Sequence, residues 1–227
     1  MKKFLGTWFS VLSIALFLAV PAAQAQLVAG RDYTVIEPAQ ATDDPARIEI
    51  VEFFSYACPH CNDLNPLIHK WAARLPQDVA FKRVPVSFNP FYELMARLFY
   101  ALETTGDLAR LDAPLFSAIH EKGLKLINEK SIADWATSQG VDAMKFSDAW
   151  RSFSVNSKTK RADQMARNHR IQGVPAIVVD GRYLIGGKSL QELLALTDKV
   201  IEKRRAERNP KSSTPAGKAP AKPIPQK

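Results

Sequence analysis

Two apolar runs separated by a helical stripe constrain the fold of this chain most strongly. Ile48–Phe54 holds five apolar residues in seven, the pattern of a buried strand. Apolar residues then recur at helical spacing as far as Leu75, and a second strand-like run spans Val79–Phe88. A strand, a helix and a second strand favour parallel pairing with a right-handed crossover. We therefore predict a β-α-β unit and an α/β fold.

The middle of the chain changes to a helical pattern. From about residue 91 to 171, apolar residues recur at helical spacing almost throughout. Ser131 and Asp142 are expected to be N-caps of two of these helices, and a longer helix is expected from about Ser154 to His169. The pattern predicts an all-helical insertion.

Strand character returns near the C-terminus. Residues 176–179 form a short apolar run, and Asp180-Gly181 is a strong two-residue hairpin signal before a second run at 182–185. Ser189 and Glu192 form a capping-box pattern that starts a last helix, expected to end near Lys203. The predicted order is β-α-β, a helical block, and β-β-α.

The N-terminus has the features of a secretory signal peptide. Lys2 and Lys3 precede an apolar stretch at 9–20, and Ala23-Gln24-Ala25 supplies a small-x-small cleavage pattern. The alternative is an uncleaved anchor helix, for which the apolar core is short. We expect residues 1–25 to be removed and the mature protein to be exported.

The formal charge of +8 comes from the two ends of the chain. Nine Lys or Arg against two Glu follow Asp198, and the signal peptide adds two lysines, so the remaining body is close to neutral. This body lacks the basic footprint of a nucleic-acid-binding domain, and no nucleic-acid partner is expected. The segment 206–227, rich in Pro and Lys, is expected to be a disordered tail.

The only two cysteines lie in the sequence Cys58-Pro59-His60-Cys61, where the first helix is expected to begin. A disulfide between them would close too short a loop to stabilise the fold appreciably. A helix N-terminus favours a thiolate at Cys58, and His60 can add a positive charge or a hydrogen bond. Pro59 suits the first helical position, where its missing N–H is not needed. We therefore expect the pair to be redox-active, with Cys58 as the nucleophile and Cys61 as the buried resolving thiol.

A second short motif completes a resemblance to a known family. The segment 52–61, Glu-Phe-Phe-Ser-Tyr-Ala-Cys-Pro-His-Cys, together with Gly173-Val174-Pro175-Ala176, resembles the DsbA family of the thioredoxin superfamily. The similarity covers roughly residues 33–203. It implies a thioredoxin fold in two parts, 26–90 and 168–205, interrupted by an all-helical domain at 91–167. It also implies that the exported protein lies in the periplasm.

The resemblance also implies roles for residues around the cysteines. Glu52 shares the alternation of the apolar residues of its strand, and the family has a buried acid here that serves proton transfer at the second cysteine. Lys82 matches the basic partner of that acid. Val174 and Pro175 are expected to form a cis-proline loop that faces the cysteines and binds extended substrate. The remaining histidines are expected to be structural or solvated.

The expected function is donation of the Cys58–Cys61 disulfide to newly exported, unfolded proteins with free cysteines. The resemblance implies reoxidation by a DsbB-type, quinone-linked oxidase of the inner membrane, and we expect the protein to act as a monomer. No cofactor beyond the disulfide and no metal are expected. Three alternatives remain: a reductase or isomerase on the same fold, a Cu- or Zn-binding protein that uses the two thiols, and a non-catalytic peptide-binding chaperone.

Overall fold

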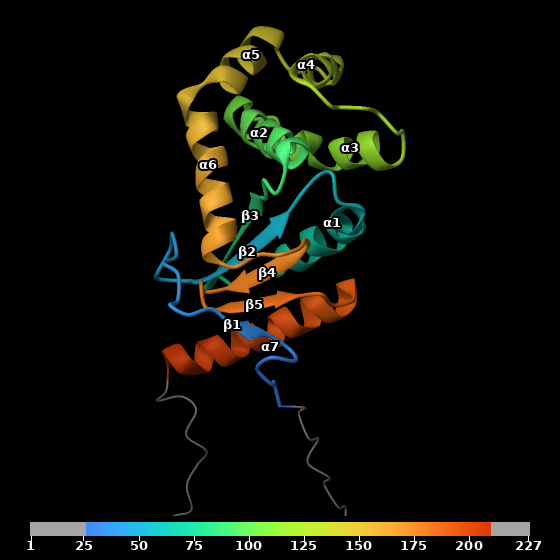
Figure 1. Cartoon of the computed structure of the whole chain (residues 1–227). Coiled ribbons are helices and arrows are strands. Elements are labelled where there is room, and N and C mark those ends of the chain that lie inside the picture. Colours follow the sequence, from blue (N-terminus) through green and yellow to red (C-terminus); the bar gives the residue numbers. More distant parts are fainter. Residues whose placement is uncertain (1–25, 210–227) are drawn as a thin grey trace, which may run out of the picture.

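A five-stranded mixed sheet forms the centre of the molecule (Figure 1). The computed structural model describes residues 26–209, so the predicted signal peptide and all but the first residues of the predicted tail lie outside the described residues. The strand order is β1-β5-β4-β2-β3. The strands are β1 (Thr34–Val35), β2 (Ile48–Phe54), β3 (Val79–Pro85), β4 (Ala176–Val179) and β5 (Tyr183–Gly186).

The central strand β2 is buried on both faces because it lies between two partners. It pairs in parallel with β3, so that Ile50 lies opposite Phe81, and antiparallel with β4. Strands β4 and β5 form the predicted hairpin, with Asp180 and Gly181 both at positive φ in its turn. The β-α-β and β-β-α predictions are confirmed, although β3 ends at Pro85 rather than Phe88.

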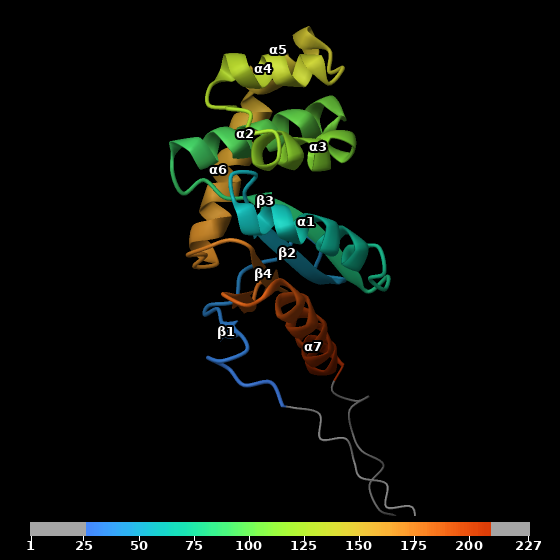
Figure 2. The same ribbon diagram turned by 90° about the vertical axis from the view of Figure 1, so that its right-hand side faces the viewer.

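Two helices, α1 (Pro59–Ala72) and α7 (Leu190–Arg208), cover one face of the sheet (Figure 2). Their apolar stripes, which include Leu64 and Val200, pack with Ile50 and Ile177 of the sheet in one buried cluster. Because α1 starts at the end of β2, this packing fixes the helix N-terminus at the edge of the sheet. That end of α1 carries the cysteine pair.

The helical insertion lies between β3 and β4, and α6 runs from the far helices back to the sheet (Figure 1). The apolar residues of the insertion form a second buried cluster with the other face of the sheet, which contributes Phe53 and Val178. Asp142 caps its helix as predicted, but Ser131 is not an N-cap: Asn128 caps that helix and Ser131 is its third residue. The helices are α2 (Pro90–Thr105), α3 (Leu108–His120), α4 (Glu129–Ser138), α5 (Ala143–Arg151) and α6 (Phe153–Asn168).

The last helix is longer than predicted. Helix α7 continues past Lys203 to Arg208, so residues 206–208, predicted to belong to the tail, are helical. Arg204 and Arg208 both pair with buried Asp180 in the hairpin turn, and these ion pairs hold the last turn against the sheet. Among residues 26–209, no helix has the length and apolar character needed to span a membrane.

Candidate active site

The cysteine pair lies at the start of α1. Cys58 is the N-cap residue, in extended conformation, and Pro59 is the first helical residue, as predicted. Cys58 is only 6% exposed, Cys61 is fully buried one turn further on, and both thiols are free. A helix N-terminus presents unpaired backbone N–H groups and the positive end of the helix dipole. This position favours negative charge on the Cys58 sulfur.

The two thiols differ in their acidity. A hydrogen bond from the Cys61 side chain, backbone N–H groups of the first turn and the nearby His60 lower the pKa of Cys58 to about 6. The same hydrogen bond, together with burial and the charge of Cys58, raises the pKa of Cys61 far above that of an ordinary cysteine. Near neutral pH the reduced site therefore holds a thiolate at Cys58 and a thiol at Cys61.

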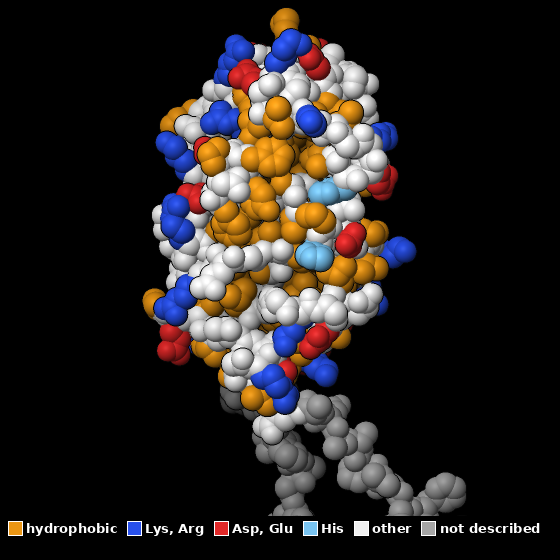
Figure 3. All heavy atoms as spheres, turned by 45° about the vertical axis from the view of Figure 1, so that its right-hand side comes forward, with side chains coloured by type: hydrophobic (Ala, Val, Ile, Leu, Met, Phe, Trp, Pro, Cys, Tyr) orange, Lys and Arg blue, Asp and Glu red, His pale blue; other side chains and the backbone are white. Residues whose placement is uncertain are grey.

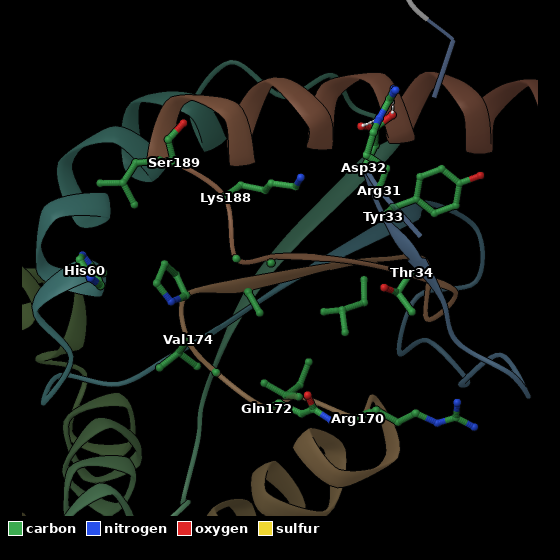
Figure 4. Close-up of a pocket in the computed structure, with 18 of the residues that line it drawn as sticks. Arg31, Asp32, Tyr33, Thr34, His60, Arg170, Gln172, Val174, Lys188 and Ser189 are labelled. Carbon is green, nitrogen blue, oxygen red and sulfur yellow. Dashed lines mark hydrogen bonds and ion pairs between the residues drawn. The ribbon is translucent and has the colours of Figure 1, made fainter. Parts of the chain in front are cut away.

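The Val174–Pro175 peptide bond is cis and lies next to the cysteines. The Val174 carbonyl oxygen is 3.4 Å from Cys58 Sγ. A groove of about 790 Å³ begins at this loop, with His60 and Val174 at one end and Arg170 and Thr34 at the other (Figure 4). The loop that connects α6 to β4 thus forms one wall of an open groove whose end at His60 and Val174 lies beside the cysteine pair.

Glu52 is fully buried beneath the pair, and its basic partner differs from the predicted one. Arg83 Nε lies 2.6 Å from Glu52 Oε2. Lys82 instead pairs with Glu49, at 3.0 Å, and with Asp43, at 2.6 Å. The predicted Glu52–Lys82 pair is therefore wrong, and Arg83 takes that place.

The register of the parallel pair explains this correction. Glu52 lies directly opposite Arg83, whereas Lys82 lies opposite Val51 and so points to the other face of the sheet. A sequence signal for this existed, because Arg83 has the same parity as Val79 and Phe81, the apolar residues of β3 that face α1. Burial raises the pKa of Glu52, and Arg83 only partly opposes this effect.

Arg83 also reaches a second buried acid, which sequence reasoning missed. Its Nη1 donates to Asp112 Oδ1 of α3 at 2.8 Å. The Tyr56 hydroxyl donates to the same oxygen at 2.6 Å, and His69 Nε2 lies 3.0 Å from Asp112 Oδ2. Asp112 falls within the apolar stripe of α3, and an acid at such a position is the signal that could have identified it.

Two stacked aromatic side chains, one exposed and one partly buried, lie near the cysteines. Phe88 is 44% exposed and stacks on Tyr92, with ring centroids 6.0 Å apart. Burial and the charges of both cysteines raise the pKa of Tyr92, which places this ring beside the pair. Figure 3 shows hydrophobic side chains along the centre of one face of the molecule, with Lys and Arg toward its edges.

The described part of the chain contains no group of three or more His, Cys, Asp or Glu side chains that could hold a metal ion. Cys58 and Cys61 are the two soft ligands available, and a closed zinc site requires four ligands. The arrangement of these two thiols, one acidic and one buried, suits thiol–disulfide exchange.

Comparison with known proteins gives a consistent result. The family described as "DSBA-like thioredoxin domain" matches residues 49–197. The thiol:disulfide interchange protein DsbA of Bordetella parapertussis is 38% identical over 192 residues, which cover 83% of this chain and 90% of that protein. The crystal structure of Pseudomonas aeruginosa DsbA superposes with a TM-score of 0.77 at 34% identity and covers 80% of this chain and 96% of that one. The oxidoreductase NmDsbA1 of Neisseria meningitidis gives a TM-score of 0.73 at 25% identity, over 82% and 97% of the two chains.

Proposed function

Because the chain belongs to the DsbA family and is a thiol:disulfide oxidoreductase with a thioredoxin fold, we propose that it works as a periplasmic disulfide donor. The observation that carries this proposal is the position of the free Cys58 thiol as N-cap of α1, where Cys61 and the backbone N–H groups of the first turn lower its pKa. A stabilised thiolate favours the reduced form of the pair and makes its disulfide a stronger oxidant. Its substrates are unfolded exported proteins with free cysteines.

The proposed reaction consists of two exchanges. A substrate thiolate attacks Cys58 Sγ of the Cys58–Cys61 disulfide, which forms a mixed disulfide and releases Cys61 as a thiolate. Cys61 then takes a proton. A second substrate thiolate attacks the substrate sulfur of the mixed disulfide, which forms the substrate disulfide and releases the Cys58 thiolate. Two electrons pass to the protein, and both of its sulfurs end reduced.

Glu52 is the proposed source of the proton for Cys61. Its carboxyl is buried close enough to Cys61 for its charge to raise the pKa of that thiol further. Burial raises the pKa of Glu52 itself, so it keeps a proton to higher pH than an exposed glutamate does. Glu52 Oε1 has no hydrogen-bond partner within residues 26–209, which leaves this oxygen free to carry the proton.

Substrate binding is proposed to use the cis-proline loop and the nearby aromatic pair. Val174 can present its backbone to an extended peptide whose cysteine reaches Cys58. Exposed Phe88 and partly buried Tyr92 offer apolar contact to the flanking residues of an unfolded chain. The expected result of Phe88→Ser is a severalfold higher KM for a cysteine-containing peptide with an unchanged reduction potential.

Catalytic turnover requires an electron acceptor, and we propose a DsbB-type, quinone-linked oxidase of the inner membrane. The support is membership of the DsbA family. The protein itself is proposed to act as a monomer, which light scattering of the mature chain tests.

The decisive experiment mixes the oxidised mature protein with a reduced, unfolded protein in anaerobic buffer. One substrate disulfide should form for each enzyme disulfide consumed, and Cys58→Ser should abolish the transfer. If the oxidised protein transfers nothing while its reduced form opens substrate disulfides, the protein is a reductase. Unchanged activity of a variant with serine at both Cys58 and Cys61 would indicate a chaperone instead.

A further inference from the structure

Arg83 is shared between two buried carboxylates. Its guanidinium contacts Glu52 through Nε at 2.6 Å and Asp112 through Nη1 at 2.8 Å. The three side chains are 9%, 0% and 7% exposed, respectively, so water screens their charges little. One positive charge cannot fully compensate two neighbouring anions, and one of the two acids is favoured to keep its proton.

The contacts of the two acids are unequal. Asp112 accepts a hydrogen bond from the Tyr56 hydroxyl and has His69 at 3.0 Å, in addition to Arg83. Glu52 has Arg83 alone among the described residues, and its second oxygen is unpartnered. Hydrogen bonds to a carboxylate stabilise its charged form. The negative charge is therefore held on Asp112 and the proton on Glu52.

We propose that Asp112 and His69 are positioning residues that set the protonation of Glu52: Asp112 competes with Glu52 for Arg83, and His69, which contacts Asp112, limits that competition. Asp112 attracts Arg83 and so weakens its hold on the Glu52 anion, which keeps the proton on Glu52. His69 stabilises Asp112 from the exposed side of α1 and so limits its pull on Arg83. This inference rests on the proposed role of Glu52 as proton donor to Cys61.

The electrostatics agree with this division. Burial alone would raise the pKa of Asp112, but contacts with His69, Arg83 and Tyr56 outweigh this effect and lower it to about 2. The charge of Asp112 adds to burial in raising the pKa of Glu52, whereas Arg83 and His69 lower it. Strand β4 contributes apolar Ile177 opposite Glu52. The titratable and charged groups around Glu52 come from four parts of the chain. Tyr56 and Cys58 precede α1, Cys61 and His69 lie on α1, Arg83 lies on β3, and Asp112 and His120 lie on α3, where His120 contacts the Tyr56 backbone.

The two positioning residues should have opposite effects. In Asp112→Asn the negative charge of Asp112 is lost and Arg83 pairs with Glu52 alone, so the pKa of Glu52 should fall by about one unit or more. In His69→Leu, Arg83 and Tyr56 still keep Asp112 ionised, but Asp112 loses one partner and draws Arg83 more strongly. Because His69 also lowers the pKa of Glu52 directly, that pKa should rise, by a smaller amount than it falls in Asp112→Asn. The His69 side chain is 52% exposed, so this second variant is expected to fold even if Asp112→Asn does not.

The experiment follows the side-chain carboxyl of Glu52 by ¹³C NMR in the mature protein in both its oxidised and its reduced form, with Glu52→Gln used to assign its signal. Asp134→Asn on α4, which replaces an exposed acid that pairs within residues 26–209 with Lys130 alone, is the matched control. The rate of mixed-disulfide formation is measured over the same pH range. Its alkaline decline should move to lower pH in Asp112→Asn and to higher pH in His69→Leu, and a one-unit move changes the rate about tenfold where it is declining.

Opposite pKa shifts of Glu52 in the two variants, with none in Asp134→Asn, would support the inference. Unchanged values, or shifts of the same sign in both variants, would overturn it without affecting the proposed disulfide transfer. If the pKa shifts appear but the rate profile does not follow them, Asp112 and His69 do set the charge of Glu52, and the proposed proton transfer from Glu52 fails instead. Glu52→Gln should remove the effect of Asp112→Asn on the rate profile in the double variant.

Discussion

The pH dependence of the reduction potential should report the Cys58 thiolate directly. The pKa of Cys58 is lowered to about 6, first by the Cys61 hydrogen bond and then by the first turn of α1 and His60. Below that pH, reduction takes up two electrons and two protons, so the potential should fall by about 59 mV per pH unit. Above it only Cys61 takes a proton, and the slope should halve to about 30 mV per unit.

The size of the effect at neutral pH follows from the same value. Compared with a free cysteine of pKa about 8.5, a pKa of about 6 favours the thiolate at pH 7 by about 1.4 kcal/mol. For a two-electron couple this corresponds to about 30 mV of added oxidising power. Because the pKa is lowered in the folded protein, this contribution is complete only above about pH 8.5 and is lost as the pH falls through about 6.

The assay equilibrates the mature protein with glutathione buffers over a range of pH and traps the free thiols by alkylation. The thiolate absorbance of reduced Cys58 gives an independent titration. In His60→Ala the pH at which the slope of the potential changes should rise by less than one unit. The reason is that the charge of His60 is the smallest of the effects named above that lower the pKa of Cys58. Lys70→Ala, an exposed cation at the other end of α1, is the control. A change of slope near pH 8.5 in the unmodified protein would refute the argument that the start of α1 holds a thiolate.

Two further predictions concern stability. Arg83→Met should lower the free energy of unfolding by about 3–5 kcal/mol because it leaves two buried acids without their cation. Lys130→Ala, which breaks an exposed pair, should cost less than about 1 kcal/mol, and urea unfolding of both variants checks this contrast. Asp180→Asn introduces a residue that also tolerates positive φ but removes the carboxylate that Arg204 and Arg208 share. It should cost about 1–3 kcal/mol and increase amide exchange in the last turn of α7, and unchanged exchange there would contradict the role given to these ion pairs.

Local patterns were sufficient to predict the α/β fold and the position of the reactive pair. Pro59 at the first helical position and the apolar run before it place Cys58 at a helix N-terminus without knowledge of the tertiary structure. The Asp180-Gly181 turn likewise specifies the hairpin by itself. Such features depend on neighbouring residues only, and for that reason they can be predicted from one sequence.

Contacts between distant segments could not be predicted in the same way. The partner of Glu52 depends on the register of two parallel strands joined by a helix, and no short turn fixes that register. Asp112 reaches the site only because α3 of the insertion packs against α1. The end of α7 depends on ion pairs to a turn 24 and 28 residues away. In each case the deciding interaction is tertiary.

The position of Asp112 gives the helical insertion a chemical role beyond covering the site. A thioredoxin fold without α3 would retain Glu52 and Arg83 on adjacent strands, and the arginine would then pair with this acid alone. Such a pair favours an ionised glutamate, which is a poor proton donor to a buried thiolate leaving group. By introducing a second acid, held in turn by His69 and Tyr56, the insertion shifts the proton toward Glu52. If Glu52 is the proton donor proposed above, the insertion contributes to the proton balance at Cys61 although it supplies neither cysteine.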